Sequence, residues 1–267
     1  MSSTSKKMQR MQTIMECKNS YKRFVQEFWE TVPGAGTMQW SFHMDLICKE
    51  LELAAKRVFN GEPREYDLIF NVPFGTSKSS LCSILFTGWT WVNMPHARHI
   101  NASHTADLVL DLAYKAREVI RSDKYRDFFP HIQLKTDQDS KGLFRNTLGG
   151  DRLACTVGGK TPTGFHGHFL SVDDPIDPQG AKSEAELITA AHFITEVLPS
   201  RKVSKETALT MLVMQRVHYR DPTHVLEKIG EKEGTKPIRK ICLPGELTND
   251  INPPLENIRI SYPEAYQ

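Results

Sequence analysis

Short apolar runs that end in turn or acidic residues alternate along this chain with longer segments of helical periodicity. Buried strands are predicted at residues 66–72, 98–103, 168–172 and 207–215, with shorter β-like runs at 143–147 and 151–157. Helices are predicted at residues 21–32, 46–58, 107–121 and 183–197, and directly after Lys78. Strands alternating with helices predict an α/β fold, in which a mostly parallel central sheet is flanked by helices on both faces.

The composition of the 267 residues is that of a globular protein, with 39% hydrophobic and 25% charged residues. No apolar run approaches the roughly 18 residues of a membrane-spanning helix, so no membrane association is expected. The net charge of +2 does not by itself indicate a nucleic-acid binder, and any such contact would need a local basic patch. The five cysteines are scattered without a C-x-x-C pair, which favours a reducing compartment such as the cytoplasm and argues against a zinc site.

Three regions are predicted from the texture of the sequence. Residues 1–17 are mildly basic and are expected to form a flexible tail. Residues 18–243 carry the strand and helix patterns of one large domain. Residues 244–267 contain four prolines with little periodicity, and they are expected to be a linker toward a further domain that this sequence does not contain.

The segment 71–80, NVPFGTSKSS, lies between a predicted strand and a predicted helix and has much of the chemistry of a phosphate-binding loop. The usual pattern is G-x-x-x-x-G-K-[ST], but valine and serine stand here at its two glycine positions. Gly75 supplies one position of free backbone, and Ser77 is a tolerable substitute if it keeps an ordinary φ. Lys78 is expected to reach the β- and γ-phosphate oxygens, and the Ser79 hydroxyl to bind Mg²⁺. The predicted ATP-binding residues of the loop are Gly75, Thr76, Ser77, Lys78, Ser79 and Ser80. Taken alone, the segment also fits a plain strand–turn–helix with a surface lysine.

Two later strand ends carry matching chemistry. The apolar run HFLSV ends in Asp173 and Asp174, which in a Mg²⁺–ATP site would hold the metal through water and orient or deprotonate the attacking water. A turn or helix start is the alternative for this D-D-P stretch. The strand over 207–215 delivers Gln215 to the same crevice, where it could sense the γ-phosphate or the attacking water, or merely cap the strand. In open α/β sheets ligands bind outside the carboxyl ends of the strands, so the three elements together favour a nucleotide site.

With these elements in this order, the sequence resembles the ATPase domain of the large terminase subunit, the DNA-packaging motor of tailed bacteriophages and prophages. The matching stretches, between about residues 24 and 243, are MQWSFHMDLICKELE, NVPFGTSKSS, LGGDRLACTVGGKTPTGFHGHFLSVDDP and MLVMQRVHYRDPTHVLEK. One branch of that family has a phosphate loop of the form N-V-P-P-G-x-x-K-S, so the missing glycines belong to its pattern. Family members often carry T-G-R-G-x-D before the acidic strand end, whereas this chain has TGFHGHF.

The resemblance implies a RecA-like, additional-strand P-loop ATPase that assembles into a ring around double-stranded DNA. Hydrolysis of ATP, with Mg²⁺, would drive translocation of viral DNA into a procapsid in the host cytoplasm, with a small terminase subunit and a portal as partners. Lys78 and Ser79 resemble the family's phosphate and magnesium ligands, Asp173 its metal-binding aspartate and Asp174 its catalytic carboxylate. Gln215 lies in the coupling motif.

Two further sets of site residues follow from the resemblance. The segment with Gln39, Trp40 and His43 is similar to the family's adenine-binding stretch, since an aromatic face and an amide edge suit a purine, although Trp40 equally fits a core position. The phosphate loop contains no arginine, so a cation from a neighbouring subunit is expected to neutralise the transferring phosphoryl group. Arg152 and Lys160 are the candidates for this trans-acting finger, and an ordinary structural or surface role is the alternative for each.

The DNA-binding surface is predicted from one local basic cluster. Arg201, Lys202 and Lys205 lie between a predicted helix and a predicted strand, where a loop could contact phosphates without reading sequence, or could simply be solvated. After residue 243 the sequence offers no cluster of acidic metal ligands, so no nuclease activity is expected from this chain.

Two other functions remain open at the level of sequence. The first is a RecA-like helicase or another nucleic-acid-stimulated ATPase, although the arginine-rich motifs expected downstream are not found. The second is a nucleotide-binding module that no longer hydrolyses ATP. Such a module has no need of the second acid, so Asp174 distinguishes it from an enzyme.

Overall fold

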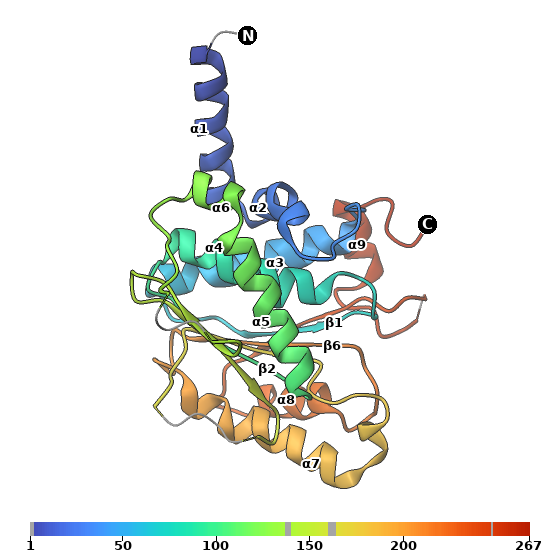
Figure 1. The fold of residues 1–267 in the computed structure, drawn as a ribbon. Coiled ribbons are helices and arrows are strands. Elements are labelled where there is room, and N and C mark those ends of the chain that lie inside the picture. The colour runs from blue at the N-terminus through green and yellow to red at the C-terminus, as the bar shows by residue number, and fades with distance from the viewer. Residues whose placement is uncertain (1–2, 137–139, 160–163, 247) are drawn as a thin grey trace.

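The computed structural model of this protein describes residues 3–136, 140–159, 164–246 and 248–267, and these form a seven-stranded sheet with helices on both faces (Figure 1). Along the sheet the strands lie in the order β3-β4-β2-β5-β6-β1-β7. Their bounds are β1 Asp67–Asn71, β2 Arg98–Ser103, β3 Leu143–Arg145, β4 Asp151–Thr156, β5 Phe169–Asp173, β6 Leu209–Met214 and β7 Ile238–Cys242. Only the pair β3 and β4 is antiparallel among the strand pairs of this sheet. The predicted α/β class with a mostly parallel sheet is confirmed.

The position of β6 defines the topology. β6 pairs in parallel with both β1 and β5, so it lies between the strand that leads into the phosphate loop and the strand that ends in the acidic pair. This inserted strand is the feature that the additional-strand, RecA-like fold requires. The carboxyl ends of β1, β6 and β5 consequently meet at one edge of the sheet, where parallel α/β sheets bind their ligands.

Helices cover the two faces of the sheet in two layers (Figure 1). One layer contains α2 (Tyr21–Phe28), α3 (Phe42–Phe59), α4 (Phe86–Asn93) and α5 (Ala106–Arg121), and the other contains α7 (Glu184–His192) and α8 (Pro222–Gly230). Successive side chains of a strand point to opposite faces. On β6, therefore, Met211 and Val213 pack into the core under α2 to α5, whereas Leu212 and Met214 pack into the core under α7.

The helix that follows the phosphate loop begins as a wide turn. Residues Ser80–Leu85 form a π-helix, which continues directly into α4. A similar π-helical segment, Phe193–Val197, extends α7. π-Helical turns are uncommon and occur frequently at functional sites, because the extra residue frees backbone groups from the regular ladder. The first of these two segments adjoins the predicted site.

The two ends of the chain differ from the predictions. Residues predicted as a flexible tail form helix α1 (Ser3–Asn19), which projects from the domain and buries Cys17 at its base (Figure 1). The predicted linker instead folds back onto the domain, since helix α9 (Leu255–Ser261) buries Ile258 and Ala265 is fully buried beyond it. Periodicity missed both helices because one is mostly polar and the other is short. The shorter helix α6 (Asp123–Phe128) and strand β7 were likewise not predicted.

Within the described residues no helix is long and apolar enough to cross a membrane.

Candidate functional site

The predicted phosphate loop joins β1 to the π-helix and bends through two left-handed residues. Gly75 has φ +75°, and Ser77 has φ +62°. The condition under which Ser77 would be a tolerable substitute, an ordinary φ, is therefore not met, because the turn needs a left-handed residue at the position that glycine occupies in the usual pattern. The bend is held by the Thr76 hydroxyl, which donates to the Pro73 carbonyl at 2.6 Å, and by Leu81 N–H, which donates to the Ser77 carbonyl.

Lys78 and the acidic pair, far apart in the sequence, meet at the carboxyl edge of the sheet. Lys78 is 6% exposed, and its Nζ lies 3.2 Å from Oδ2 of Asp174. Asp174 is itself held in a left-handed conformation, φ +45°, with its N–H bonded to the Val213 carbonyl of β6. Its own carbonyl accepts from the backbone and ring nitrogens of His104, at 3.2 and 2.8 Å. The Asp174 carboxylate is thus held beside the phosphate loop, at the carboxyl edge of the sheet.

Asp173, the last residue of β5, is buried next to Asp174. Its Oδ2 accepts a hydrogen bond from the Ser83 hydroxyl at 2.8 Å, whereas Oδ1 has no partner among the described residues. Burial and the neighbouring Asp174 raise the pKa of Asp173 to about 6, whereas the Ser83 hydrogen bond, the nearby Ser79 hydroxyl and the charge of Lys78 lower it.

These groups fit a magnesium ion. Mg²⁺ takes oxygen ligands, keeps several waters and commonly uses one or two protein groups beside the substrate phosphates. The free Oδ1 of Asp173 and the hydroxyl of Ser79 supply that kind of set. In the described part of the chain no group of three or more His, Cys, Asp or Glu side chains is arranged to hold a metal.

Gln215 follows the last residue of β6, the strand that lies between β1, which leads into the phosphate loop, and β5, which ends in the acidic pair. Together with Asn71 and Pro73 it lines a hollow at the ends of β6, β1 and β7. Asn71 donates from Nδ2 to the Met214 carbonyl at 3.2 Å and to the Thr223 hydroxyl at 2.9 Å, which ties the end of β1 to the start of α8. Gln215 thus shares a hollow with Pro73 at the start of the loop, and its role as a sensor of a bound nucleotide stays a prediction.

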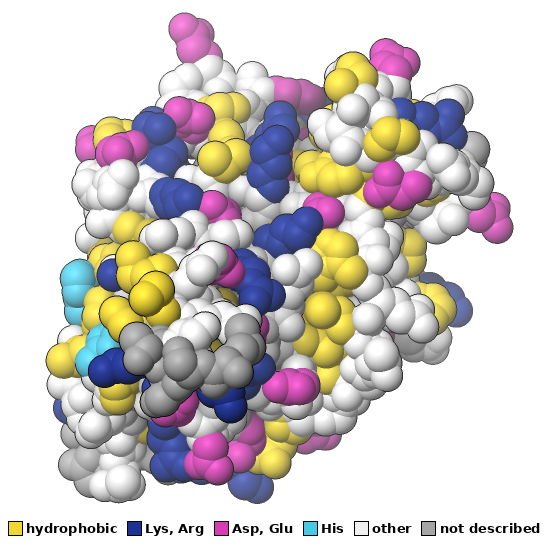
Figure 2. Space-filling view, turned by 90° about the horizontal axis from the view of Figure 1, so that it is seen from above, with side chains coloured by type: hydrophobic (Ala, Val, Ile, Leu, Met, Phe, Trp, Pro, Cys, Tyr) yellow, Lys and Arg dark blue, Asp and Glu magenta, His cyan; other side chains and the backbone are white. Residues whose placement is uncertain are grey.

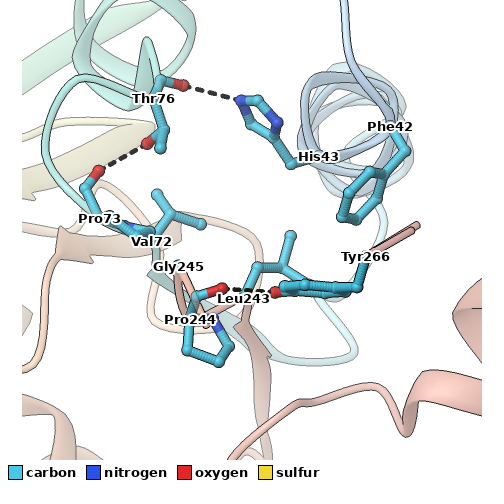
Figure 3. A pocket seen from close by; sticks show the side chains of 9 residues that line it. All are labelled: Phe42, His43, Val72, Pro73, Thr76, Leu243, Pro244, Gly245 and Tyr266. Atoms are coloured by element: carbon cyan, nitrogen blue, oxygen red, sulfur yellow. Dashed lines mark hydrogen bonds between the residues drawn. The ribbon is translucent and has the colours of Figure 1, made fainter. Parts of the chain in front are cut away.

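A second pocket opens beside the phosphate loop and is lined mainly by apolar groups (Figure 3). Its volume is about 160 Å³, which is smaller than the roughly 300–1,000 Å³ of pockets that enclose a whole drug-sized ligand. The lining residues are Phe42, His43, Val72, Pro73, Thr76, Leu243, Pro244, Gly245 and Tyr266. The rings of Phe42 and Tyr266, 5.6 Å apart between centroids, form one side of it, and the Tyr266 hydroxyl donates to the Pro244 carbonyl at 2.7 Å.

His43 connects this pocket to the phosphate loop. Its Nε2 lies 3.0 Å from the Thr76 carbonyl, and its Nδ1 lies 3.1 Å from the Ser41 hydroxyl (Figure 3). Because a carbonyl only accepts, Nε2 carries the proton and donates. Burial lowers the pKa of His43, so the imidazole is neutral at physiological pH. His43 therefore lies at the edge of this pocket, and its predicted place in an adenine-binding stretch stays a prediction.

Gln39 and Trp40 do not line that pocket. Gln39 is exposed, and Trp40 packs against the main core with Lys22 Nζ 5.5 Å above its ring. The alternative interpretation of Trp40 as a core residue is the one that fits. The aromatic faces beside the loop come instead from Phe42, two residues further along, and from Tyr266 at the other end of the chain.

Arg152 lies inside the domain. The side chain is fully buried in β4, so a role as a finger that reaches a neighbouring subunit is wrong for this residue. Burial lowers its pKa to about 9, with the charge of Asp173 opposing that shift. Lys160, the other candidate, falls outside the residues that the structure describes.

The predicted DNA-contacting cluster lies at the opposite edge of the sheet. Lys202 Nζ is 3.1 Å from Oδ2 of Asp67, at the start of β1, and the lysine side chain is only 5% exposed. That cation is engaged inside the protein and is not available to DNA, which contradicts its predicted role. On the face where α1 and α2 lie, positive, negative and hydrophobic side chains are interspersed (Figure 2).

The sheet order, with the loop after β1 and an acidic pair after β5, defines a RecA-like α/β fold. One solved structure shares this fold. The crystal structure of the HK97 bacteriophage large terminase matches with a TM-score of 0.55 at 13% identity, over 83% of this chain and 42% of that chain. A large terminase from a thermophilic bacteriophage matches with a TM-score of 0.42 at 12% identity, over 78% of this chain and 50% of that one.

At such identities the HK97 likeness shows a shared fold, and this chain spans less than half the length of the HK97 protein. No protein-family model and no curated protein sequence matches the chain.

Sequence reasoning missed three residues of the site. Ser83 carried no signal, because it lies within an apolar helix and its contact with Asp173 depends on the π-helical turn. Tyr266 belongs to a segment interpreted as a linker. Phe42 was within reach of prediction, since it stands beside His43 in the stretch already singled out.

Proposed function

We propose that this chain binds ATP with Mg²⁺ and hydrolyses it, as the ATPase domain of a DNA-packaging motor of the large-terminase type. The observation that carries the proposal is the ion pair between Lys78 and Asp174. It joins the loop after β1 to the acidic pair after β5, with Asp173 buried next to Asp174, and a nucleotide hydrolase needs these three charges in one crevice.

Each residue of the proposed site would have one role in the reaction. Lys78 would leave Asp174 and bind the β- and γ-phosphates, which frees the Asp174 carboxylate to accept a proton from the attacking water. Asp173, through Oδ1, and Ser79 would hold the Mg²⁺, which when bound neutralises charge on the phosphates. Gln215 would contact the γ-phosphate or the water from the end of β6. Backbone N–H groups of residues 75–79 would cradle the phosphates at the start of the helix.

The pocket lined by Phe42 and Tyr266 would take the purine. Its aromatic walls suit stacking, and His43 fixes the loop at the pocket's edge. Tyr266→Ala is expected to weaken nucleotide affinity about 5- to 10-fold, since stacking on one aromatic ring contributes roughly 1 kcal/mol. Titration with a fluorescent ADP analogue measures the change. The control is Tyr219→Ala, an exposed tyrosine outside the pocket, and equal affinities for both variants would contradict the assignment.

The motor role rests on the fold shared with the HK97 large terminase and on the sequence motifs. Double-stranded DNA would be the translocated substrate, and several copies would form a ring whose neighbours supply the missing cation. Arg152 is excluded from that task by its burial. A small terminase subunit and a portal would complete the packaging machine.

The test is ATP turnover as a function of protein concentration, with and without duplex DNA. A rate per chain that rises with concentration and responds to DNA is expected for a ring motor. A constant rate without a DNA response would contradict the motor while leaving an ATPase. If the chain binds nucleotide but does not turn it over, and Asp174→Ala changes neither property, the non-hydrolysing module is the correct alternative.

A further inference from the structure

Arg152 is a buried cation in the middle of the fold. It is the second residue of β4, two strands from Asp173 in the sheet order, and none of its side chain is exposed. A buried guanidinium is unfavourable unless its donors are satisfied, and an apolar side chain of the same volume usually stabilises a core at least as well. Packing alone therefore does not account for an arginine at this position.

The Arg152 side chain contacts the helix that follows the phosphate loop. Nη2 donates to the Ser83 carbonyl at 3.1 Å, and the guanidinium lies 5.9 Å from the centroid of the Phe144 ring. Nε and Nη1 have no hydrogen-bond partner among the described residues. Its one direct polar contact with the described protein is thus with the helix that follows the phosphate loop.

The π-helical turn makes this contact possible. In the segment Ser80–Leu85 the regular ladder is widened, and two carbonyls accept bonds from outside the helix. The Leu81 carbonyl accepts from the Tyr21 hydroxyl, and the Ser83 carbonyl accepts from Arg152. The same residue, Ser83, then donates its hydroxyl to Oδ2 of Asp173 at 2.8 Å.

We propose that Arg152 is a positioning residue for the magnesium site, acting through Ser83 on Asp173. Arg152 anchors the Ser83 backbone and the Ser83 hydroxyl donates to Oδ2 of Asp173, so Oδ1, which has no hydrogen-bond partner among the described residues, is the oxygen assigned to the metal. This inference rests on the proposed function, and it assigns to a core residue the orientation of a metal ligand. Outer partners of this kind typically change metal affinity or activity by about 10- to 100-fold when removed.

The experiment measures binding of a fluorescent ADP analogue to the 267-residue chain in excess Mg²⁺ and in EDTA. The ratio of the two affinities reports the metal site separately from nucleotide binding itself. Arg152→Met and Ser83→Ala are each expected to reduce this ratio about 10-fold while the affinity in EDTA stays unchanged.

Arg152→Lys, which keeps a cationic donor, is expected to recover part of the loss. The double variant is expected to lose no more than the larger single loss, because both residues act on one carboxylate.

The control for Ser83→Ala is Thr90→Ala. Thr90 is a fully buried hydroxyl further along the same helix, bonded to Nε2 of His99 at 2.8 Å and not to Asp173, and its loss should leave the ratio unchanged. A wild-type ratio in Ser83→Ala, or losses that add in the double variant, would overturn the inference. Should Arg152→Met fail to fold, Ser83→Ala and Arg152→Lys still decide the question. A wild-type chain that binds no nucleotide would overturn the proposed function itself, which distinguishes the two failures.

Discussion

Two aspartates at opposite edges of the same sheet have opposite surroundings. Asp67, at the start of β1, accepts from the Thr210 N–H at 2.8 Å and pairs with Arg64 and Lys202 at 3.0 and 3.1 Å. Asp173, at the end of β5, has a second acid beside it and one oxygen without a partner in the described chain. At the amino edge of the sheet, where the strands begin, the Asp67 carboxylate is neutralised by two cations of the protein. At the carboxyl edge, where the strands end, Asp173 keeps one oxygen to which no described residue donates a hydrogen bond.

Backbone strain follows the same division. The non-glycine residues with left-handed φ in the described chain are Ser77, Asp174 and Tyr266, and all three lie around the proposed nucleotide site. Such conformations cost of order 1–3 kcal/mol each and persist where the surrounding structure holds them. We therefore expect the amino edge to contribute mainly to the stability of the fold. The carboxyl edge holds a strained geometry that suits a bound ligand.

The largest effect is expected at the carboxyl edge. Lys78→Ala should reduce ATP turnover to background, because Lys78 is the cation that the proposed site offers to the β- and γ-phosphates. Steady-state hydrolysis by the folded variant measures the change. A variant that hydrolyses ATP at the normal rate would exclude the proposed site.

At the amino edge, loss of a cation should lower the stability of the fold and leave ATP turnover unchanged. Lys202→Met removes one cation from Asp67, and the free energy of unfolding should fall by about 1–3 kcal/mol, since Arg64 and the Thr210 N–H still satisfy part of the carboxylate. Turnover per folded molecule should be unchanged. Lys205→Met, an exposed neighbour, is the control, with an expected change within about 0.5 kcal/mol. Loss of turnover in a fully folded Lys202→Met chain would contradict the division between the edges.

The smallest effect concerns the strain in the phosphate loop. Ser77→Gly should raise the free energy of unfolding by up to about 1 kcal/mol, because glycine adopts φ +62° without the penalty of a side chain, partly offset by its greater freedom when unfolded. Ser80→Gly, three residues on in the π-helix, should instead destabilise by about 1 kcal/mol. Thermal melts of the two variants compare them. Equal shifts in both would show that φ at Ser77 carries no strain.

Much of the fold was predictable from local pattern. The strand at 98–103 was predicted with the bounds that β2 has, and the helix at 107–121 begins within one residue of α5. Buried parallel strands are short apolar runs, and amphipathic helices repeat with the period of one turn, so both are visible in a single sequence. The helices α1 and α9 were missed because neither has a strong stripe and their ordering depends on the surfaces that they contact.

The sequence by itself determined which side chains stand at the ends of the strands: the lysine after β1, the acids after β5 and the glutamine after β6. Strand polarity then brought them to one edge, because parallel strands end together. Only the tertiary structure decided that Arg152 faces inward beneath a π-helical turn and that Tyr266 closes a pocket beside Phe42. Those contacts join residues that are remote in sequence, and they depend on packing directions that no local periodicity encodes.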